Sequence, residues 1–182
     1  MDPDGKAILD ELKSEGLTAD DVHTVLLTHG HIDHTSAAVL FKKAKIYVGK
    51  EDIPLITGED KGTGLGAVFA RMSTPRPMPK DLLPLNGGET LEVDGEQVKV
   101  IAVPGHTDGS RMYLYGDVLF TGDSLQGGGK ELSLAPSFFS KDVAKNRKSL
   151  EVLKELPFTI IADGHTGATA NAREKLKRFL AK

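Results

Sequence analysis

The chain has 182 residues, of which 39% are apolar and 27% are charged, and its formal net charge is −3. This length predicts a single domain over residues 1–182 that buries a full core. The weak negative charge excludes a strongly basic nucleic-acid binder and gives no reason to expect a membrane surface as a partner. No apolar run approaches the roughly 18 residues of a membrane-spanning helix. Because residues 1–5 also lack the features of a signal peptide, we expect a cytoplasmic protein.

The sequence contains no cysteine. Disulfides, thiolate metal ligands and a cysteine nucleophile are therefore excluded. A metal site in this chain has to be built from histidine, aspartate and glutamate.

Apolar periodicity and capping residues predict the elements of the first part of the chain. They are a helix over 6–15, a buried strand over 23–27, a helix over 36–44, a strand over 45–48 and a short helix over 51–56. Asp4 is expected to cap the first helix, and Thr18 and Asp21 to form a capping pair in the turn that follows it. The segment 57–81 is rich in Gly, Pro and Met and is expected to be a long loop that could act as a lid.

Two hairpins dominate the second part of the chain. The first has strands over 89–93 and 97–103 joined by Asp94-Gly95, and the second has strands over 111–115 and 118–121 joined by Gly116-Asp117. A helix over 142–155, a strand over 158–162 and a helix from about 171 complete the chain. Strands mixed with helices predict α/β layering, and the hairpins make part of the sheet antiparallel.

Five of the six histidines lie in loops that directly follow predicted strands, next to Gly or Asp. They are His29, His31 and His34 in the first loop, His106 in a later one and His165 in the last. Asp33 and Asp123 add carboxylates to loops of the same kind. Since strand ends place such loops on one rim of a sheet, these side chains are expected to converge there. His23 is out of step with this pattern and is expected to be a structural histidine.

The spacing of the first motif indicates two metal ions. In a tight extended loop, alternate residues such as His29 and His31 can point the same way and bind one ion, while Asp33 and His34 turn towards a second. Two ions about 3.5–4 Å apart are the usual arrangement for metal-assisted hydrolysis. Asp123 is a natural bridge because its carboxylate has two oxygens to share. Imidazole nitrogens and carboxylate oxygens suit zinc and iron alike, so the residue types do not select the metal.

These motifs, in this order, resemble the signature of the metallo-β-lactamase-fold hydrolases: His29-x-His31-x-Asp33-His34, Gly105-His106-Thr107, Gly122-Asp123 and Gly164-His165. The resemblance implies an αββα sandwich of mixed sheets flanked by helices, with the site at one sheet edge. It also implies a first metal ion held by His29, His31 and His106, and a second held by Asp33, His34 and His165, with Asp123 between them.

Family members usually begin with a run of N-terminal strands, which we expect to be missing here. An uncovered sheet edge would favour pairing of copies into a homo-oligomer.

Within this family, the motifs around Gly105 and Gly122 look most like the glyoxalase II-like group, whose members hydrolyse thioesters. The resemblance implies a dinuclear hydrolase in which a metal-bound hydroxide attacks the carbonyl of a small thioester or ester. Asp33 is the expected catalytic residue, since it can orient the nucleophile or move its proton. Two zinc ions are the expected cofactors, with iron or manganese left open.

Other members of the family leave alternatives open. A β-lactamase with a cysteine ligand is excluded because the chain has no cysteine, and the histidine-only type usually lacks an Asp at the position of Asp123. Persulfide dioxygenases share these motifs but use a single iron ion. A truncated member that binds metal without catalysis is the third alternative.

Overall fold

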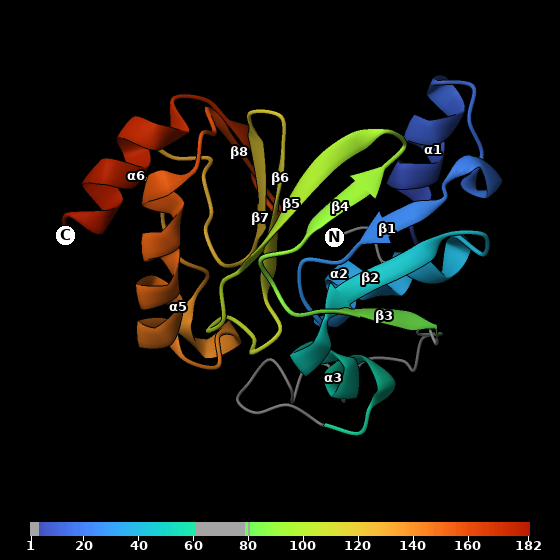
Figure 1. Cartoon of the computed structure of the whole chain (residues 1–182), viewed down its shortest axis with the longest axis horizontal. Helices are drawn as coiled ribbons and strands as arrows, with labels where there is room; N and C mark the ends of the chain where they lie inside the picture. Colours follow the sequence, from blue (N-terminus) through green and yellow to red (C-terminus); the bar gives the residue numbers. More distant parts are fainter. Residues whose placement is uncertain (1–3, 61–78, 80) are drawn as a thin grey trace.

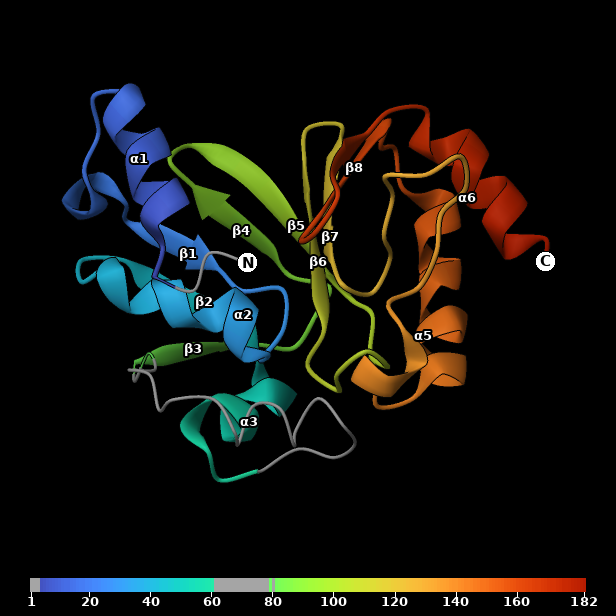
Figure 2. The same ribbon diagram turned by 180° about the vertical axis from the view of Figure 1, so that it is seen from behind.

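The computed structural model describes residues 4–60, 79 and 81–182 of the chain. Two β-sheets face each other, and helices cover the outer face of each sheet (Figure 1). Figure 2 shows the same four layers from behind, with α5 and α6 on one outer side and α1, α2 and α3 on the other. The predicted αββα sandwich is thus confirmed.

The first sheet contains three parallel strands in the order β1-β2-β3: β1 (Thr24–Leu26), β2 (Lys45–Gly49) and β3 (Leu82–Leu85). The first two strands confirm the sequence prediction, whereas β3 was not predicted. It contains Pro84, which cannot donate a backbone hydrogen bond. This strand lies at the edge of its sheet, which is where proline is tolerated in a strand.

The second sheet is mixed and has the order β4-β5-β6-β7-β8-β9. Its strands are β4 (Thr90–Val93), β5 (Glu96–Ala102), β6 (Arg111–Tyr115), β7 (Val118–Gly122), β8 (Ile160–Asp163) and β9 (Gly167–Thr169). Neighbours are antiparallel except β7 and β8, which are parallel. Both predicted hairpins are present. In the first turn, Asp94 and Gly95 have φ of 52° and 84°, as a two-residue type I′ turn requires.

The α-helices are α1 (Lys6–Ser14), α2 (Ile32–Thr35), α3 (Ile53–Thr57), α5 (Val143–Ser149) and α6 (Ala172–Leu180). Short 3₁₀ helices are η1 (Ala19–Asp21), η2 (Ser36–Leu40), η3 (Lys50–Asp52), η4 (Ser137–Phe139) and η5 (Leu150–Glu155). The helix predicted over 36–44 is wrong in its bounds: helical backbone begins at Ile32, inside the histidine motif, and continues as η2. The helix predicted over 142–155 is α5 followed by η5.

The two capping predictions have opposite outcomes. Asp21 accepts hydrogen bonds from the backbone nitrogen and the hydroxyl of Thr18 (2.8 and 2.6 Å), which confirms the capping pair. The cap at Asp4 is wrong, because Gly5 is the N-cap of α1 with a φ of 66°. A Cβ at this position would lie 2.4 Å from Leu40 Cδ1, so both the positive φ and the close contact favour glycine here.

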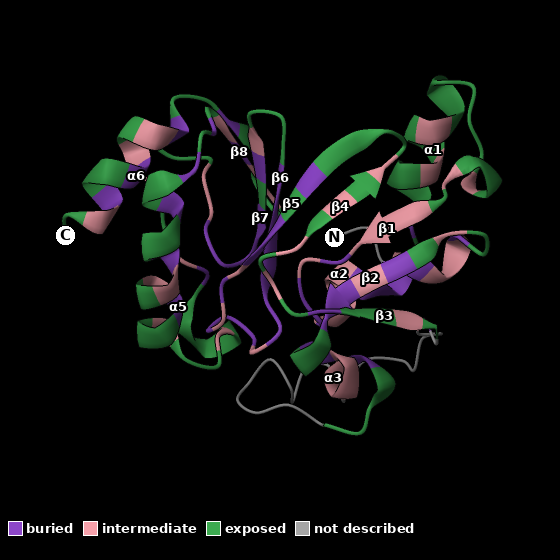
Figure 3. Cartoon of the chain, viewed as in Figure 1, coloured by how far each residue is buried: buried purple, intermediate pink, exposed green. Residues whose placement is uncertain are grey.

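Buried apolar side chains form three clusters between the layers, and Figure 3 marks the buried residues along the ribbon. One cluster joins the first sheet to its helices (Ile46, Ile56), one joins the two sheets (Leu85, Tyr113), and one joins the second sheet to η5 and α6 (Leu119, Leu150, Leu176). Neighbours in β5 serve different clusters: Val100 packs between the sheets and Ile101 packs with the helices. This follows from the alternation of side chains along a strand.

Most of the segment that the sequence predicts as a lid, residues 61–78 and 80, lies outside the described residues. None of the helices in the described part of the chain is long and apolar enough to cross a membrane.

Candidate metal centre

All seven residues that the sequence predicts as metal ligands converge in the structure. They come from four segments that follow strands: His29, His31, Asp33 and His34 follow β1, with Asp33 and His34 in α2, while His106 follows β5, Asp123 follows β7 and His165 follows β8. Three groups of these side chains have their nitrogen and oxygen atoms close enough to hold a metal ion: His29, His31 and His106; His29, His34 and Asp123; and Asp33, His34 and His165. His23, expected to be structural, is exposed and belongs to none of these groups.

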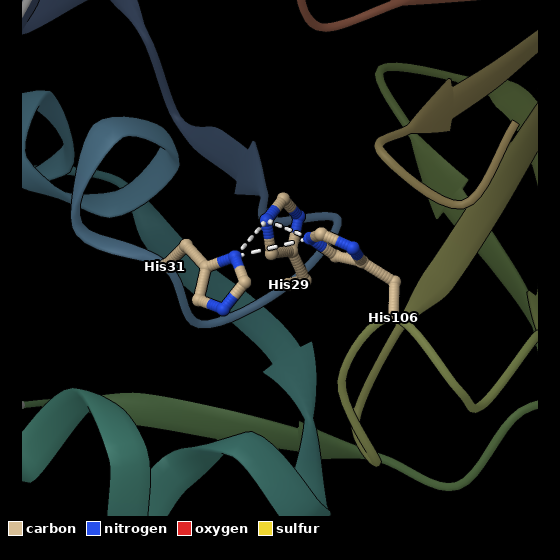
Figure 4. Close-up of side chains that lie close together, drawn as sticks. All are labelled: His29, His31 and His106. Carbon is tan, nitrogen blue, oxygen red and sulfur yellow. Dashed lines mark hydrogen bonds between the residues drawn. The ribbon is translucent and has the colours of Figure 1, made fainter. Parts of the chain in front are cut away.

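Three imidazole nitrogens of the first group point at one another (Figure 4). His31 Nδ1 lies 3.1 Å from His29 Nε2 and 3.0 Å from His106 Nε2, and the two Nε2 atoms are 3.3 Å apart. Two nitrogens that bind one zinc ion at about 2.0–2.1 Å in tetrahedral geometry are themselves roughly 3.3 Å apart. The three histidines are therefore spaced as ligands of one metal ion.

Hydroxyl groups hold the outer nitrogens of two of these rings. Thr28 Oγ1 lies 3.2 Å from His29 Nδ1, and Ser140 Oγ lies 3.1 Å from His106 Nδ1. When Nδ1 carries the ring proton, it donates to the hydroxyl and leaves the Nε2 lone pair free to face the centre. Sequence reasoning did not find Thr28 or Ser140, because a hydroxyl residue near a histidine is too common to be a signal.

Burial keeps the first group of histidines neutral. His29 and His106 are each 1% exposed. Burial, reinforced by the neighbouring histidines, lowers the pKa of His106 to about 3 and lowers the pKa of His29 well below its usual range. Burial also lowers the pKa of His31. Neutral imidazole is the form that binds a metal, so no proton has to be displaced at neutral pH.

The Asp123 carboxylate lies between the first group and the second. Its Oδ2 is 3.7 Å from His106 Nε2, while its Oδ1 is 3.3 Å from His34 Nε2 and 3.0 Å from His165 Nε2. Asp33 Oδ2 completes the second group at 3.5 Å from His34 Nε2 and 4.0 Å from His165 Nε2. One carboxylate therefore faces both groups.

Two buried atoms of the centre lack a partner with hydrogen-bond geometry among the described residues: His34 Nε2 and Asp123 Oδ1. Buried polar atoms are rarely left unpaired in folded proteins. Burial alone would raise the pKa of Asp123, but the surrounding histidines, His34 first, outweigh it and lower that pKa to about 2. An ionised carboxylate beside an unpaired imidazole nitrogen is a donor set that fits a metal ion.

Glycines let the ligand loops approach their neighbours closely. A Cβ on Gly105 would lie 2.1 Å from the backbone nitrogen of Asn146 in α5, and one on Gly164 would lie 2.4 Å from His34 Cε1. Any side chain at either position would push a ligand loop away from the centre. Close packing therefore explains why a glycine directly precedes His106 and His165 in the sequence.

Comparisons with known proteins agree with this geometry. The model of the Metallo-beta-lactamase superfamily matches residues 1–165. A hydroxyacylglutathione hydrolase of Dechloromonas aromatica is 30% identical over 178 residues, which cover 95% of this chain and 55% of that protein. The chain thus spans about half the length of this relative.

Solved structures share the fold over most of both chains. The crystal structure of the B3 metallo-beta-lactamase BLEG-1 matches with a TM-score of 0.76 and 28% identity, covering 98% of this chain and 85% of that chain. A protein solved in a di-iron-bound form matches with a TM-score of 0.68 and 29% identity, covering 93% of this chain and 81% of that chain. The sequence match, the αββα layers and the converging histidines lead to one conclusion: this chain belongs to the metallo-β-lactamase superfamily.

Proposed function

We propose that the chain is a metal-dependent hydrolase that uses two metal ions to cleave a small thioester or ester. One observation carries the proposal: a cluster of three neutral imidazoles adjoins a cluster of imidazoles and carboxylates, and Asp123 faces both. This is the donor set of a two-metal hydrolytic site.

In this proposal the first ion is held by His29, His31 and His106, the second by Asp33, His34 and His165, and Asp123 is shared between them. Such ions lower the pKa of water and polarise a carbonyl oxygen when bound. The protein's contribution is to hold the ligands in place before any ion arrives. Thr28 and Ser140 fix two of the rings, and burial keeps those rings unprotonated.

Asp33 is proposed as the catalytic carboxylate. Its Oδ2 lies beside both His34 and His165, and its side chain is 23% exposed, so a water molecule and a substrate can reach it. From this position Asp33 can accept the proton of the attacking water at a carboxylate oxygen and return it to the leaving group.

The substrate and the metal are proposed from the relatives. Relatives named hydroxyacylglutathione hydrolase favour a thioester as the substrate. The similarity to a B3 β-lactamase makes a β-lactam the competing candidate substrate. Asp123 favours the thioester, because the histidine-only β-lactamases usually lack this carboxylate. Zinc is the proposed metal, and the neighbour in a di-iron-bound form makes iron the alternative. The weak net charge favours a small molecule over a nucleic acid.

The first experiment is the metal content of protein purified without chelator, followed by hydrolysis assays with a thioester, a lactone and a β-lactam. Two zinc ions per chain with thioester hydrolysis would support the proposal. One iron ion per chain with oxygen uptake on a persulfide would replace it with a dioxygenase, and no metal after reconstitution would overturn both. Asp123→Asn should lose at least one ion, whereas His23→Asn, which changes a histidine outside the centre, should keep both.

A further inference from the structure

We propose that Asp52 is a positioning residue for the metal centre: its carboxylate ties the loop that carries His29 and His31 to the loop that carries His106. This inference rests on the metal centre of the proposed function, and it concerns a residue that lies outside the three candidate ligand groups.

Three hydrogen bonds place the Asp52 carboxylate between the two loops. Its Oδ2 accepts from the backbone nitrogen of Gly30 (2.7 Å) and from Thr107 Oγ1 (2.6 Å), and its Oδ1 accepts from the backbone nitrogen of Gly109 (2.7 Å). Gly30 lies between His29 and His31 in the sequence, and Thr107 directly follows His106. A single side chain thus contacts the immediate neighbours of all three histidines.

The two ligand loops come from different sheets, so contacts between the sheets have to keep this spacing. One loop follows a strand of the first sheet and the other follows a strand of the second, yet His31 Nδ1 and His106 Nε2 lie 3.0 Å apart. A metal site tolerates displacements of only about 0.5 Å before its geometry is lost. The Asp52 carboxylate provides a short polar link between the sheets next to the ligands.

Close packing leaves the Asp52 side chain no alternative position. It is 2% exposed. A Cβ on Gly109 would lie 2.4 Å from Asp52 Cγ, and a Cβ on Gly30 would lie 3.1 Å from Asp52 Cβ. The glycine backbones therefore enclose the carboxylate, and the distance between the loops is set by its dimensions.

Stability alone is a weak reason for this arrangement. Among the described residues, the hydrogen-bond donors to Asp52 are two amides and a hydroxyl, all neutral. A buried carboxylate that is held by neutral donors alone is costly. Burial raises the pKa of Asp52 even though these three hydrogen bonds lower it. An arrangement that costs free energy but fixes the ligand loops is consistent with a positioning role.

The test compares metal binding by Asp52→Asn with that of the wild-type protein. The substitution keeps the size of the side chain but replaces one acceptor with an NH₂ group that faces the donors around Asp52. We expect Co²⁺ and Zn²⁺ to bind about 10- to 100-fold more weakly, as for other groups that orient metal ligands. The visible absorption of the Co²⁺ form should change, because it reports the arrangement of the ligands. Affinity is measured by competition with a chromophoric chelator, without substrate.

Glu51→Gln is the matched control, since it removes the same charge from the neighbouring residue. Glu51 pairs with Arg111 at 2.6 Å and has no hydrogen bond to either ligand loop in the described part of the chain. It should keep wild-type affinity and the wild-type Co²⁺ spectrum, even where urea unfolding shows that its metal-free form is less stable. Wild-type binding by Asp52→Asn, or an equal loss of affinity in Glu51→Gln, would overturn the inference.

A second variant covers the case in which Asp52→Asn does not fold. Thr107→Val removes only the hydroxyl donor, so a smaller loss of affinity is expected, and unchanged metal binding would refute the positioning role.

The two proposals can fail separately. Protein that binds two ions but hydrolyses no thioester overturns the proposed function alone, whereas equal binding by Asp52→Asn overturns this inference alone.

Discussion

Ser140 illustrates how a single hydroxyl can orient a proposed metal ligand. Its Oγ lies 3.1 Å from His106 Nδ1, on the side of the ring that faces away from the other histidines. His106 is almost fully buried, so the described structure offers the ring little freedom to find another partner. The hydroxyl thus fixes the orientation of the ring.

Ser140→Ala should weaken metal binding about 10-fold, because the ring of His106 loses the partner that fixes its orientation. Folding should change little, since Ser140 is only half-buried. Competition with a chromophoric chelator measures the affinity. Ser137→Ala is the matched control and should bind metal as the wild-type protein does, because Ser137 is an exposed serine at the start of η4, three residues before Ser140. Equal affinities for both variants would contradict the role of Ser140.

The sequence predicts the seven candidate ligands, and the structure brings them together, because each lies at a strand end in a local motif. Asp52 could not be found in this way. Its partners Gly30 and Gly109 are 22 and 57 positions away, so the link exists only once both sheets have formed. Residues that act on the site through tertiary contacts leave no local pattern.

At the scale of elements, Tyr113 joins the two sheets. It lies in β6, and its hydroxyl donates to the carbonyl of Leu27 at the end of β1 over 2.6 Å. Burial raises the pKa of this hydroxyl, so it stays protonated as a donor. The hydrogen bond ends beside His29, which connects the packing of the sheets to the position of the first ligand loop.

Tyr113→Phe should lower the free energy of unfolding by about 1–2 kcal/mol, because the buried Leu27 carbonyl loses its hydrogen bond. Urea unfolding measures the change. Tyr115→Phe is a matched control in the same strand, since Tyr115 is 45% exposed and should tolerate the loss of its hydroxyl. A destabilisation of the same size in both variants would show that the hydrogen bond to Leu27 is unimportant.

Asp108 connects the loop after β5 to the segment that leads into α5. Its carboxylate pairs with Lys141 at 2.5 Å and with Lys145 at 3.0 Å. These two lysines, Lys141 first, lower the pKa of Asp108 below its ordinary value. A carboxylate with a lower pKa in the folded state stabilises the fold above the unfolded pKa of about 3.9, and this contribution is lost as pH falls through the folded pKa.

Asp108→Asn should therefore reduce stability at pH 7 and have a smaller effect below about pH 4. Because the Asp108 side chain is 35% exposed, screening by solvent limits the loss to about 1 kcal/mol or less. Urea unfolding at pH 7 and pH 3 measures both values. In 1 M salt the difference at pH 7 should shrink, and a loss that is independent of pH and salt would exclude the ion pairs as its cause.

The elements that the sequence failed to predict are those whose local signal is weak. The strand β9 has three residues and begins with Gly167, and β3 contains a proline. Neither would form a strand alone, so pairing with β8 and β2 decides their structure. The hairpins, in contrast, have strong turn signals and were predicted from their sequences.

At the scale of the whole molecule, the candidate metal centre spans the two sheets. Four of its seven side chains follow β1 of the first sheet, and the other three follow strands of the second. An ion bound by His29, His31 and His106 would link the sheets directly. Metal binding should then stabilise the entire fold, because these ligands come together only when the sheets are packed.

Removal of the metal with a chelator should therefore lower the Tm. A ligand present at 100 times its Kd stabilises a protein by about 2.7 kcal/mol, which corresponds to roughly 5–10 °C for a chain of this size. Differential scanning calorimetry with and without chelator measures the shift. The shift should persist in His23→Ala, which leaves the centre intact. It should shrink strongly in His106→Ala, which removes the one member of the His29, His31 and His106 group that follows a strand of the second sheet. An equal shift in both variants would locate the stabilising ion elsewhere, because only a centre built from both sheets makes the global stability depend on His106.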